Sequence, residues 1–138
     1  MRKGTISDIA QLMEIRAAVT ENRLNSPASV CFEDYLWYIQ NWRIWIIENN
    51  QRLLGFSASN PRDGSIWAVF VDPPSEGLGI GQMLLEQAIA DLAREGHSKA
   101  HLTTEAGSRA EGFYRHLGWR QTGIAVDGDL VFEKQLDQ

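Results

Sequence analysis

The sequence lacks the features that mark several classes of protein. Its 138 residues include one cysteine, Cys31, so an intrachain disulfide and a thiolate-rich metal site are both excluded. It has no run of basic residues, and its formal net charge of -5 would repel a phosphate backbone rather than attract it. We therefore expect no nucleic-acid partner.

Long apolar runs are also missing. The most apolar stretches, residues 44–47 and 66–71, are far shorter than the roughly 20 residues that span a bilayer, so we expect no membrane association. The residues after Met1, Arg2 and Lys3 are too polar for an export signal. Together with the single cysteine, these absences predict a cytoplasmic protein.

The composition is that of an ordinary globular protein. Hydrophobic residues make up 43% of the chain and charged residues 22%, without an internal repeat, a low-complexity tract or a linker-like stretch. A chain of this length can bury well over half of the surface that its unfolded form exposes. We expect residues 1–138 to form a single domain.

The spacing of apolar residues predicts two helices in the first third of the chain, over residues 6–19 and 32–42. Ser7 or Asp8 can cap the first amides of the first helix. The side chains expected to be buried are Ile9, Leu12, Met13, Ile15 and Val19 in the first helix, and Phe32, Tyr35, Leu36 and Ile39 in the second.

Two further helices carry clearer signals. The helix that begins near Ile80 has one apolar face, and Gly96 stands where a left-handed C-terminal cap is expected. A shorter helix opens with Ser108 and Glu111 in the spacing of a capping box and ends at Gly118.

Runs rich in β-branched and aromatic residues predict strands between these helices. Residues 43–48, 52–59 and 65–71 read as an antiparallel meander. Residues 99–104 should pair in parallel with 65–71, because a strand-helix-strand crossover is nearly always right-handed and parallel. The chain closes with a hairpin around Asp127-Gly128-Asp129. The fold class is therefore α+β, a mixed sheet with helices packed on it.

Three glycines alternate where the helix near Ile80 begins: Gly77, Gly79 and Gly81. The first amides of a helix lack intrahelical acceptors, so a glycine-rich turn at this point can bind a phosphate. A tight turn with close helix-sheet packing explains the glycines equally well. A P-loop is excluded, since glutamine and methionine follow the last glycine, and the G-x-G-x-G spacing disfavours a dinucleotide fold.

A second group lies in the helix after Ser108. Ala110, Phe113 and Tyr114 share a helical face with Leu117, so Tyr114 should point toward the sheet, where a phenol needs a polar partner. Together, the stretches VFVDPPSEGLGIGQMLL and AEGFYRHLGW resemble the two signature motifs of the GCN5-related N-acetyltransferase (GNAT) superfamily. The order of elements agrees along nearly the whole chain, whereas residue-level matching is confined to these two stretches.

The resemblance implies a mixed sheet of six or seven strands flanked by about four helices, with splayed parallel strands that admit acetyl-CoA as acyl donor. It implies that the glycine loop binds the pyrophosphate through backbone amides and that the preceding strand pairs with the pantetheine arm. The cofactor-binding residues expected on this basis are Phe70, Val71, Glu76, Gly77, Leu78, Gly79, Ile80, Gly81 and Gln82.

Tyr114 matches the tyrosine that donates a hydrogen bond to the departing thiolate in the superfamily. A free phenol, with a pKa near 10, is a weaker acid than a thiol, with a pKa near 8.5, so stabilisation of the thiolate is a safer expectation than full proton transfer. The competing interpretation is a core tyrosine with a structural hydrogen bond.

Three positions depart from the superfamily pattern. Glu76 stands where Gln or Arg is usual, and its carboxylate would weaken phosphate binding unless it points away. Gly107 replaces an asparagine that is often found there, and Ser108 is the candidate to supply the lost cofactor contact. The strand that usually opens the fold is reduced to residues 1–5, so it should be very short or absent.

No motif identifies the general base or the acceptor pocket. Glu105, directly after the strand over 99–104, is the first candidate for a base that takes the proton of the amine. Glu33 and Trp37 are candidates for binding the acceptor, since a carboxylate and aromatic faces suit an ammonium group. Each also fits a plain role, as a solvated carboxylate or a packed aromatic residue. Glu33 and Asp34 are further candidates for the base, and Tyr38 and Trp42 are further aromatic residues that could line an acceptor pocket.

The remaining polar residues suggest no second chemistry. His97 and His101 are four apart, but Gly96 ends the helix before them and His101 lies in a strand, so we expect no metal site. Cys31 has no histidine nearby in sequence that would activate its thiol.

The sequence predicts an N-acetyltransferase, an acyltransferase that passes an acetyl group from acetyl-CoA to a primary amine by direct attack in a ternary complex. The acceptor is a small-molecule amine, a peptide N-terminus or a lysine. The alternative is a catalytically degenerate acyl-CoA-binding or sensor module with the same fold. A homodimer is compatible with exposed aromatic residues or an edge strand.

Overall fold

The protein was analysed as a computed structural model, which describes residues 1–20 and 31–136. The chain divides into two compact units, each of which is described by itself. Unit 1 comprises Met1–Ala58 and Ala68–Ala88, and unit 2 comprises Ser59–Trp67 and Ile89–Gln138. A single domain over the whole chain stays a prediction.

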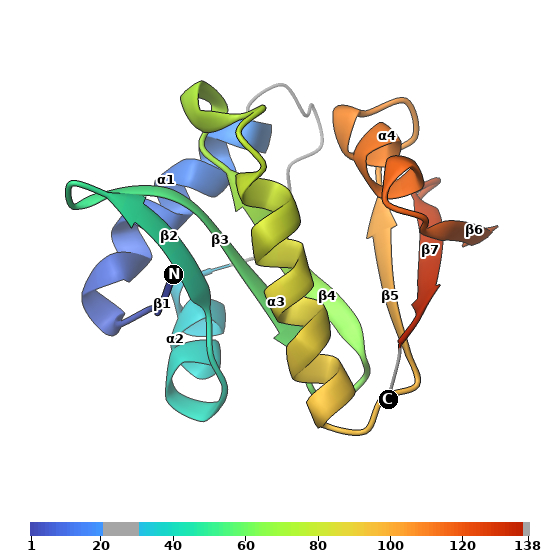
Figure 1. The fold of residues 1–138 in the computed structure, drawn as a ribbon, viewed down its shortest axis with the longest axis horizontal. Helices are drawn as coiled ribbons and strands as arrows, with labels where there is room; N and C mark the ends of the chain where they lie inside the picture. Colours follow the sequence, from blue (N-terminus) through green and yellow to red (C-terminus); the bar gives the residue numbers. More distant parts are fainter. Residues whose placement is uncertain (21–30, 137–138) are drawn as a thin grey trace. The chain divides into compact units, whose positions relative to one another are not determined.

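Within the described ranges, seven strands follow the order β1-β2-β3-β4-β5-β7-β6 (Figure 1). Strands β1 to β3 are antiparallel neighbours, whereas β4 and β5 are parallel, with Ser65 opposite His101. This arrangement confirms the mixed sheet and its parallel pair; the splaying of that pair stays a prediction. The strands are β1 (Arg2–Lys3), β2 (Trp45–Asn49), β3 (Arg52–Asn60), β4 (Ser65–Val71), β5 (Lys99–Thr104), β6 (Arg120–Ile124) and β7 (Leu130–Gln135).

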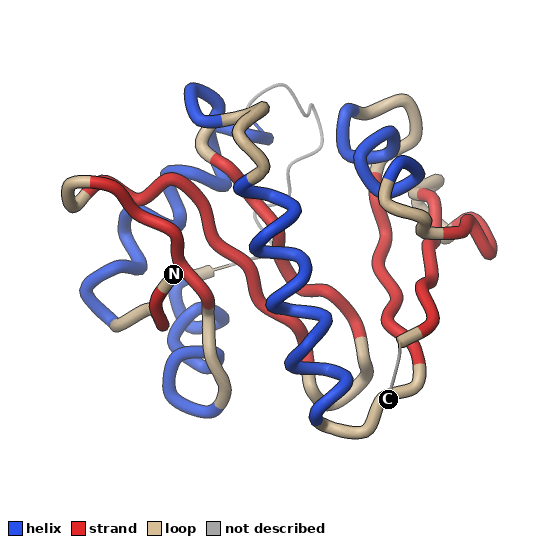
Figure 2. Tube along the Cα trace, in the orientation of Figure 1, coloured by secondary structure: helices blue, strands red, loops and turns tan. Residues whose placement is uncertain are grey.

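The same ranges contain four α-helices and two short 3-10 helices, η1 and η2 (Figure 2). The number and order of the α-helices agree with the sequence prediction. None of the helices in this part of the chain is both long and apolar enough to cross a membrane. The helices are η1 (Ile6–Asp8), α1 (Ile9–Thr20), α2 (Phe32–Asn41), η2 (Pro73–Ser75), α3 (Ile80–Arg94) and α4 (Arg109–His116).

The predicted buried faces of the first two helices are partly wrong. Met13 and Val19 in α1 are 36% and 40% exposed, and Phe32 in α2 is 43% exposed. Met13 lies about a quarter-turn from the centre of the buried stripe, while Val19 and Phe32 occupy terminal turns. The residues of these helices that are buried are Ile9, Leu12 and Ile15 in α1, and Tyr35 and Tyr38 in α2.

Strand β3 is buried on both faces, because successive side chains point to opposite sides of a sheet. On one face, the Ser57 hydroxyl donates to the Leu84 carbonyl oxygen of α3 at 2.8 Å. On the other, the Phe56 ring lies 6.1 Å from the ring of Tyr35 in α2 and 5.6 Å from that of Phe70 in β4. Within unit 1, α3 therefore covers one side of β3, and α2 covers the other (Figure 1).

Only a glycine allows α3 to lie this close to β3. A β-carbon at Gly55 would lie 2.8 Å from the Phe70 carbonyl oxygen, 3.0 Å from Leu84 Cδ1 and 3.3 Å from Ile80 Cγ2. The first of these contacts is with backbone, which cannot rotate away as a side chain can. Gly55 thus sets the distance between the first turns of α3 and the sheet.

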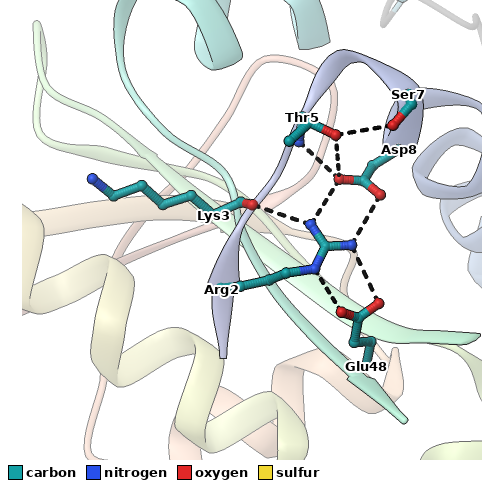
Figure 3. Close-up of polar contacts among 6 residues, drawn as sticks. All are labelled: Arg2, Lys3, Thr5, Ser7, Asp8 and Glu48. Atoms are coloured by element: carbon teal, nitrogen blue, oxygen red, sulfur yellow. Dashed lines mark hydrogen bonds and ion pairs between the residues drawn. The ribbon is translucent and has the colours of Figure 1, made fainter. Parts of the chain in front are cut away.

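The two-residue strand β1 is held by a partly exposed cluster of ion pairs (Figure 3). Arg2 donates from Nη1 and Nη2 to the two Asp8 carboxylate oxygens at 2.9 and 3.0 Å, and from Nε to Glu48 Oε1 at 2.6 Å. Asp8 Oδ2 also accepts from the Thr5 amide at 2.8 Å. Asp8 thereby caps the start of η1, whereas Ser7, the other predicted cap, contacts only the Thr5 hydroxyl.

We predict that Asp8→Asn destabilises the protein in a pH-dependent way. The Arg2 guanidinium lowers the pKa of Asp8 from 3.8 to about 2. The stabilisation is therefore full above pH 4 and is lost as the pH falls through the folded-state pKa. At pH 7 we expect a loss of about 1–3 kcal/mol in the free energy of unfolding, measured by urea denaturation.

The difference between Asp8→Asn and the parent protein should shrink between pH 4 and pH 2. Glu14→Gln, which alters an exposed carboxylate on α1, should change stability by less than about 0.5 kcal/mol at every pH. An equal loss of stability at pH 7 and pH 2 in Asp8→Asn would contradict the assigned role of the ion pair.

Candidate functional site

The loop between β4 and α3 is anchored at its start. The Asp72 amide donates to the Leu54 carbonyl oxygen at 2.8 Å, and its carboxylate accepts from Arg52 Nη2 at 2.9 Å. The chain then forms η2, in which the Ser75 amide donates back to the Asp72 carbonyl oxygen at 2.8 Å. These bonds fix the end of β4 and the first half of the loop to β3.

Two glycines in the second half of the loop have left-handed backbone conformations. The φ angles of Gly77 and Gly79 are +85° and +80°, a region that side-chain-bearing residues rarely adopt. A β-carbon at either position would meet nothing within 4 Å. Close packing therefore does not explain these two glycines; the close-packing glycine is Gly55, which the sequence analysis did not single out.

The loop presents a row of backbone donors. Between Gly77 and Gln82, no backbone amide donates a hydrogen bond to another residue of the described chain. The first such bond runs from the Met83 amide to the Gly79 carbonyl oxygen, at 3.2 Å. Six consecutive donors at the positive end of the α3 dipole form an arrangement that favours an anion.

The expected cofactor residues flanking these amides differ in burial. Ile80, the first residue of α3, is buried, Gly81 and Val71 are partly buried, and Leu78 is 71% exposed. The Glu76 amide donates to the Pro73 carbonyl oxygen at 3.2 Å, and the residue is exposed. That its carboxylate points away from a bound phosphate stays a prediction.

Phe70, near the end of β4, is packed between an aromatic ring and a cation. The Arg16 guanidinium of α1 lies 4.6 Å from the centre of its ring. Burial raises the pKa of Tyr35 in α2, and the charge of Arg16 opposes that rise. Neither Arg16 nor its contact with Phe70 was expected from sequence. The signal was present, since Arg16 lies four residues after Leu12 and seven after Ile9, and so shares their buried face.

Tyr114, in unit 2, points into the core as predicted. It is 7% exposed, and its ring lies 5.6 Å from that of Trp119 and 6.4 Å from that of Phe132. Burial raises the pKa of Tyr114 above its ordinary value, so the phenol stays protonated. Its hydroxyl makes no hydrogen bond within residues 1–20 and 31–136, so a structural hydrogen bond does not account for it there.

The start of α4 confirms the predicted capping box with one difference. The Ser108 hydroxyl accepts from the Glu111 amide at 3.2 Å and donates to the Glu105 carbonyl oxygen at 2.6 Å. The Glu111 carboxylate accepts from the Gly107 amide at 2.8 Å rather than from Ser108 itself. Because the Ser108 hydroxyl proton is already used, a cofactor contact would have to use its remaining lone pair.

Gly107, where the superfamily often has asparagine, has a φ of +78°. Asparagine is one of the few side-chain-bearing residues that tolerate this conformation. The departure therefore preserves the backbone while removing the side-chain amide. The Glu105 carboxylate beside it is exposed, and its role as general base stays a prediction.

The acceptor candidates on α2 have different surroundings. The Asp34 carboxylate accepts from the Cys31 amide at 2.9 Å and so caps the helix. Tyr38 is a core residue whose ring meets that of Trp37 edge-on at 5.1 Å. Trp37 is partly buried and Glu33 is exposed, so these two keep the accessibility that acceptor binding requires.

His97 and His101 have structural partners in unit 2. His97 Nε2 lies 2.8 Å from the Pro61 carbonyl oxygen, and His101 Nε2 lies 2.9 Å from that of Asp63. Both rings therefore hold the turn between β3 and β4. Among the described residues there is no group of three or more His, Cys, Asp or Glu side chains that could hold a metal.

Comparison with known proteins places these features in one family. The sequence pattern described as "Acetyltransferase (GNAT) family" matches residues 10–119. The chain is 40% identical over 70 residues to serotonin N-acetyltransferase 2, chloroplastic, of Oryza sativa subsp. japonica. The matched stretch covers 51% of this chain and 34% of that protein. It is 41% identical over 66 residues to peptidyl-lysine N-acetyltransferase YjaB of Salmonella typhimurium, 46% of this chain and 41% of that protein.

The matches to these curated relatives thus span only about a third to two fifths of their length. The fold agrees along nearly the whole chain with that of PaiA N-acetyltransferase from Thermoplasma acidophilum in complex with coenzyme A. The TM-score is 0.79, with 17% identity, and the alignment covers 97% of this chain and 96% of that one. The chain belongs to the acetyltransferase (GNAT) family.

Proposed function

We propose that this chain is an acetyl-CoA-dependent N-acetyltransferase that acts on a primary amine by direct attack in a ternary complex. The observation that carries the proposal is the row of six backbone amides from Gly77 to Gln82 without hydrogen-bond partners in the described chain. Two left-handed glycines hold this row open, and no atom fills the space beside their α-carbons. A pyrophosphate needs such donors and such space.

The proposed roles follow the direction of the chain. The amides of the loop bind the pyrophosphate, and the backbone at Phe70 and Val71 pairs with the pantetheine arm. Asp72 supports this assignment, because its bonds to Leu54 and Arg52 hold the junction between strand and loop in place. A preorganised site loses less conformational entropy when the ligand binds.

Tyr114 is proposed to assist the departure of the thiolate. The neutral amine nitrogen attacks the thioester carbonyl carbon, the carbon-sulfur bond breaks, and the sulfur leaves with the bonding electrons. The Tyr114 hydroxyl donates a hydrogen bond to that sulfur. The amine proton passes to a base, for which Glu105 remains the candidate.

The alternative is a binding or sensor module that keeps the fold without catalysis. Glu76 favours this alternative, because a carboxylate near the phosphates would oppose cofactor binding. Tyr114 opposes it, since the residue is only 7% exposed while its hydroxyl makes no hydrogen bond within the described chain and so remains available to donate to a ligand.

Ligand-dependent melting tests the cofactor assignment. We predict that acetyl-CoA and CoA, each at about 100 times its dissociation constant, add about 2.7 kcal/mol and raise the melting midpoint by several degrees. ATP at the same concentration should not, because it lacks the pantetheine arm. Absence of any shift with millimolar CoA would overturn the assignment.

A matched pair of glycine variants tests the loop. Gly79→Ala and Gly128→Ala both place a side chain at a left-handed position, with φ of +80° and +91°, where nothing lies within 4 Å. Both should lower the free energy of unfolding by about 1–2 kcal/mol. Only Gly79→Ala should weaken CoA binding, by about tenfold or more in calorimetry, and equal affinities in the two variants would contradict the loop's role.

Tyr114→Phe tests the catalytic role. The hydroxyl has no hydrogen-bond partner in the described chain, so its loss should change the free energy of unfolding by less than about 1 kcal/mol. We expect kcat to fall about 100-fold or more while the affinity for acetyl-CoA stays within about twofold. An unchanged kcat in a steady-state assay of CoA release would remove Tyr114 from the mechanism.

The finer assignments stay proposals. The acceptor is a small-molecule amine, a peptide N-terminus or a lysine, and the YjaB relative is named for action on peptidyl-lysine. A cytoplasmic location agrees with the single cysteine. A homodimer is one arrangement that the edge strand β6 would allow.

A further inference from the structure

Tyr114 lies in the last turn of α4, at a helix end with a defined backbone geometry. The Trp119 amide donates to the Tyr114 carbonyl oxygen at 3.0 Å, and the Gly118 amide donates to the Arg115 carbonyl oxygen at 3.1 Å. Gly118 has a φ of +89°. Two such bonds around a left-handed glycine form a Schellman motif, which folds the residue after the glycine back against the helix. Trp119 is therefore bonded to Tyr114 through the backbone.

The side chains of these two residues are also in contact. The centres of the Tyr114 and Trp119 rings are 5.6 Å apart, and their planes are inclined at 67°. This edge-to-face arrangement is one that aromatic pairs favour. The Phe113 and Phe132 rings lie 5.1 and 6.4 Å from the Tyr114 ring and complete its surroundings in unit 2. Trp119 thus meets Tyr114 twice, at its backbone and at its ring.

Packing alone sets the direction of the Tyr114 hydroxyl. That hydroxyl makes no hydrogen bond within the described residues, 1–20 and 31–136, so no polar contact there orients the side chain. The rotamer of the ring decides where the hydroxyl points. The direction matters in a group proposed to donate to a departing thiolate, because a displacement of about 1 Å in an active site can cost about 100-fold in rate.

The tryptophan at position 119 carries a polar atom that the core does not use. Trp119 is 3% exposed, and its Nε1 atom is fully buried without a hydrogen-bond partner in the described part of the chain. A buried N–H without a partner destabilises a protein, and phenylalanine would supply an aromatic ring without that group. Filling the core therefore does not by itself require tryptophan here. The larger indole ring is the property that remains to be explained.

We propose that Trp119 is a positioning residue, whose ring and backbone bond hold the Tyr114 hydroxyl toward the departing sulfur. This inference rests on the proposed acetyltransferase function. In this role Trp119 touches none of the reacting atoms and exchanges no proton; it acts only through Tyr114. The indole is then retained because its size fixes the Tyr114 ring, in spite of its unpaired N–H.

Two substitutions at Trp119 test the role in the full-length protein. Release of CoA from acetyl-CoA is measured with the best acceptor found in a screen of amines. Trp119→Leu removes the ring contact and keeps the backbone bond, so kcat should fall about 10-fold or more while the affinity for acetyl-CoA stays within about twofold. Trp119→Phe keeps an aromatic contact and should recover part of the lost kcat. It also tests the contact if Trp119→Leu does not fold.

Coupling to Tyr114 distinguishes positioning from general structural support. In the Tyr114→Phe background no hydroxyl remains to be oriented. Trp119→Phe should therefore lower the remaining kcat by less than about twofold there, and by more than that in the parent. A loss of activity through weakened structure would be the same in both backgrounds.

Leu136→Ala is the matched control. Leu136 is 8% exposed in the same unit, directly after β7, and its amide donates to the Ser98 carbonyl oxygen at 2.9 Å. The substitution should lower the melting midpoint, because it removes a buried side chain. Below that midpoint it should leave kcat within about twofold of the parent value, since it does not alter the Tyr114 ring contacts.

A measurement without any ligand checks the contact itself. The rings of the three tyrosines are labelled with ¹³C and observed by NMR, and the Tyr114 signals are those lost in Tyr114→Phe. The Tyr114 ring should flip faster in Trp119→Leu than in the parent, because close packing hinders the rotation. Leu136→Ala should leave the flipping rate unchanged. Equal rates in Trp119→Leu and the parent would contradict the proposal.

The outcomes separate this inference from the proposed function. Equal losses of kcat from Trp119→Phe with and without the Tyr114 hydroxyl would overturn the inference and make Trp119 a core residue only. So would an unchanged kcat in Trp119→Leu or in Tyr114→Phe, while acetyl transfer by the parent would still support the proposed function. A parent protein that binds no CoA and releases none from acetyl-CoA with any amine would overturn the proposed function, and the inference with it.

Discussion

The close approach of α3 to β3 at Gly55 governs the geometry of unit 1. A β-carbon there would lie 3.0 Å from Leu84 Cδ1 and 3.3 Å from Ile80 Cγ2 of α3, and 2.8 Å from the Phe70 carbonyl oxygen of β4, so the helix can lie this close to the strand only where the side chain is missing. Ile80 and Leu84, in the first turns of α3, fill the space that is left. The height of the helix start above the sheet, and with it the position of the unpaired loop amides, depends on this one contact.

Burial of β3 on both faces divides the chemistry of unit 1 between two sides. The side with Gly55 and Ser57 contacts α3, the helix that follows the loop amides in the chain. The side with Phe56 contacts Tyr35 of α2, and Arg16 of α1 lies on the neighbouring Phe70 ring. The two sides differ in kind: one offers backbone donors and a helix dipole, the other offers side chains.

Features encoded locally were predictable from sequence. The start of α3, the strand over Lys99–Thr104 and the Ser108 cap depend on residues within one or two turns of each other, and all were located correctly. Features that depend on a distant partner were not. Gly55 looks like an ordinary glycine in a strand until α3 is placed against it, and Arg16 looks like a surface cation until Phe70 is placed below it. The predicted burial of Met13 and Phe32 was wrong for the same reason: the spacing of apolar residues identifies the face of a helix but not how much of that face other elements cover.

The burial of Tyr114 separates two protonation requirements that would otherwise conflict. An amine becomes a nucleophile only when alkaline conditions remove its proton, and an ordinary phenol would begin to lose its own proton over part of that range. Because burial raises the pKa of Tyr114, its hydroxyl remains a donor while the amine is already neutral. The upper end of the working pH range would then be set by the stability of the thioester and of the fold rather than by the loss of the hydrogen-bond donor.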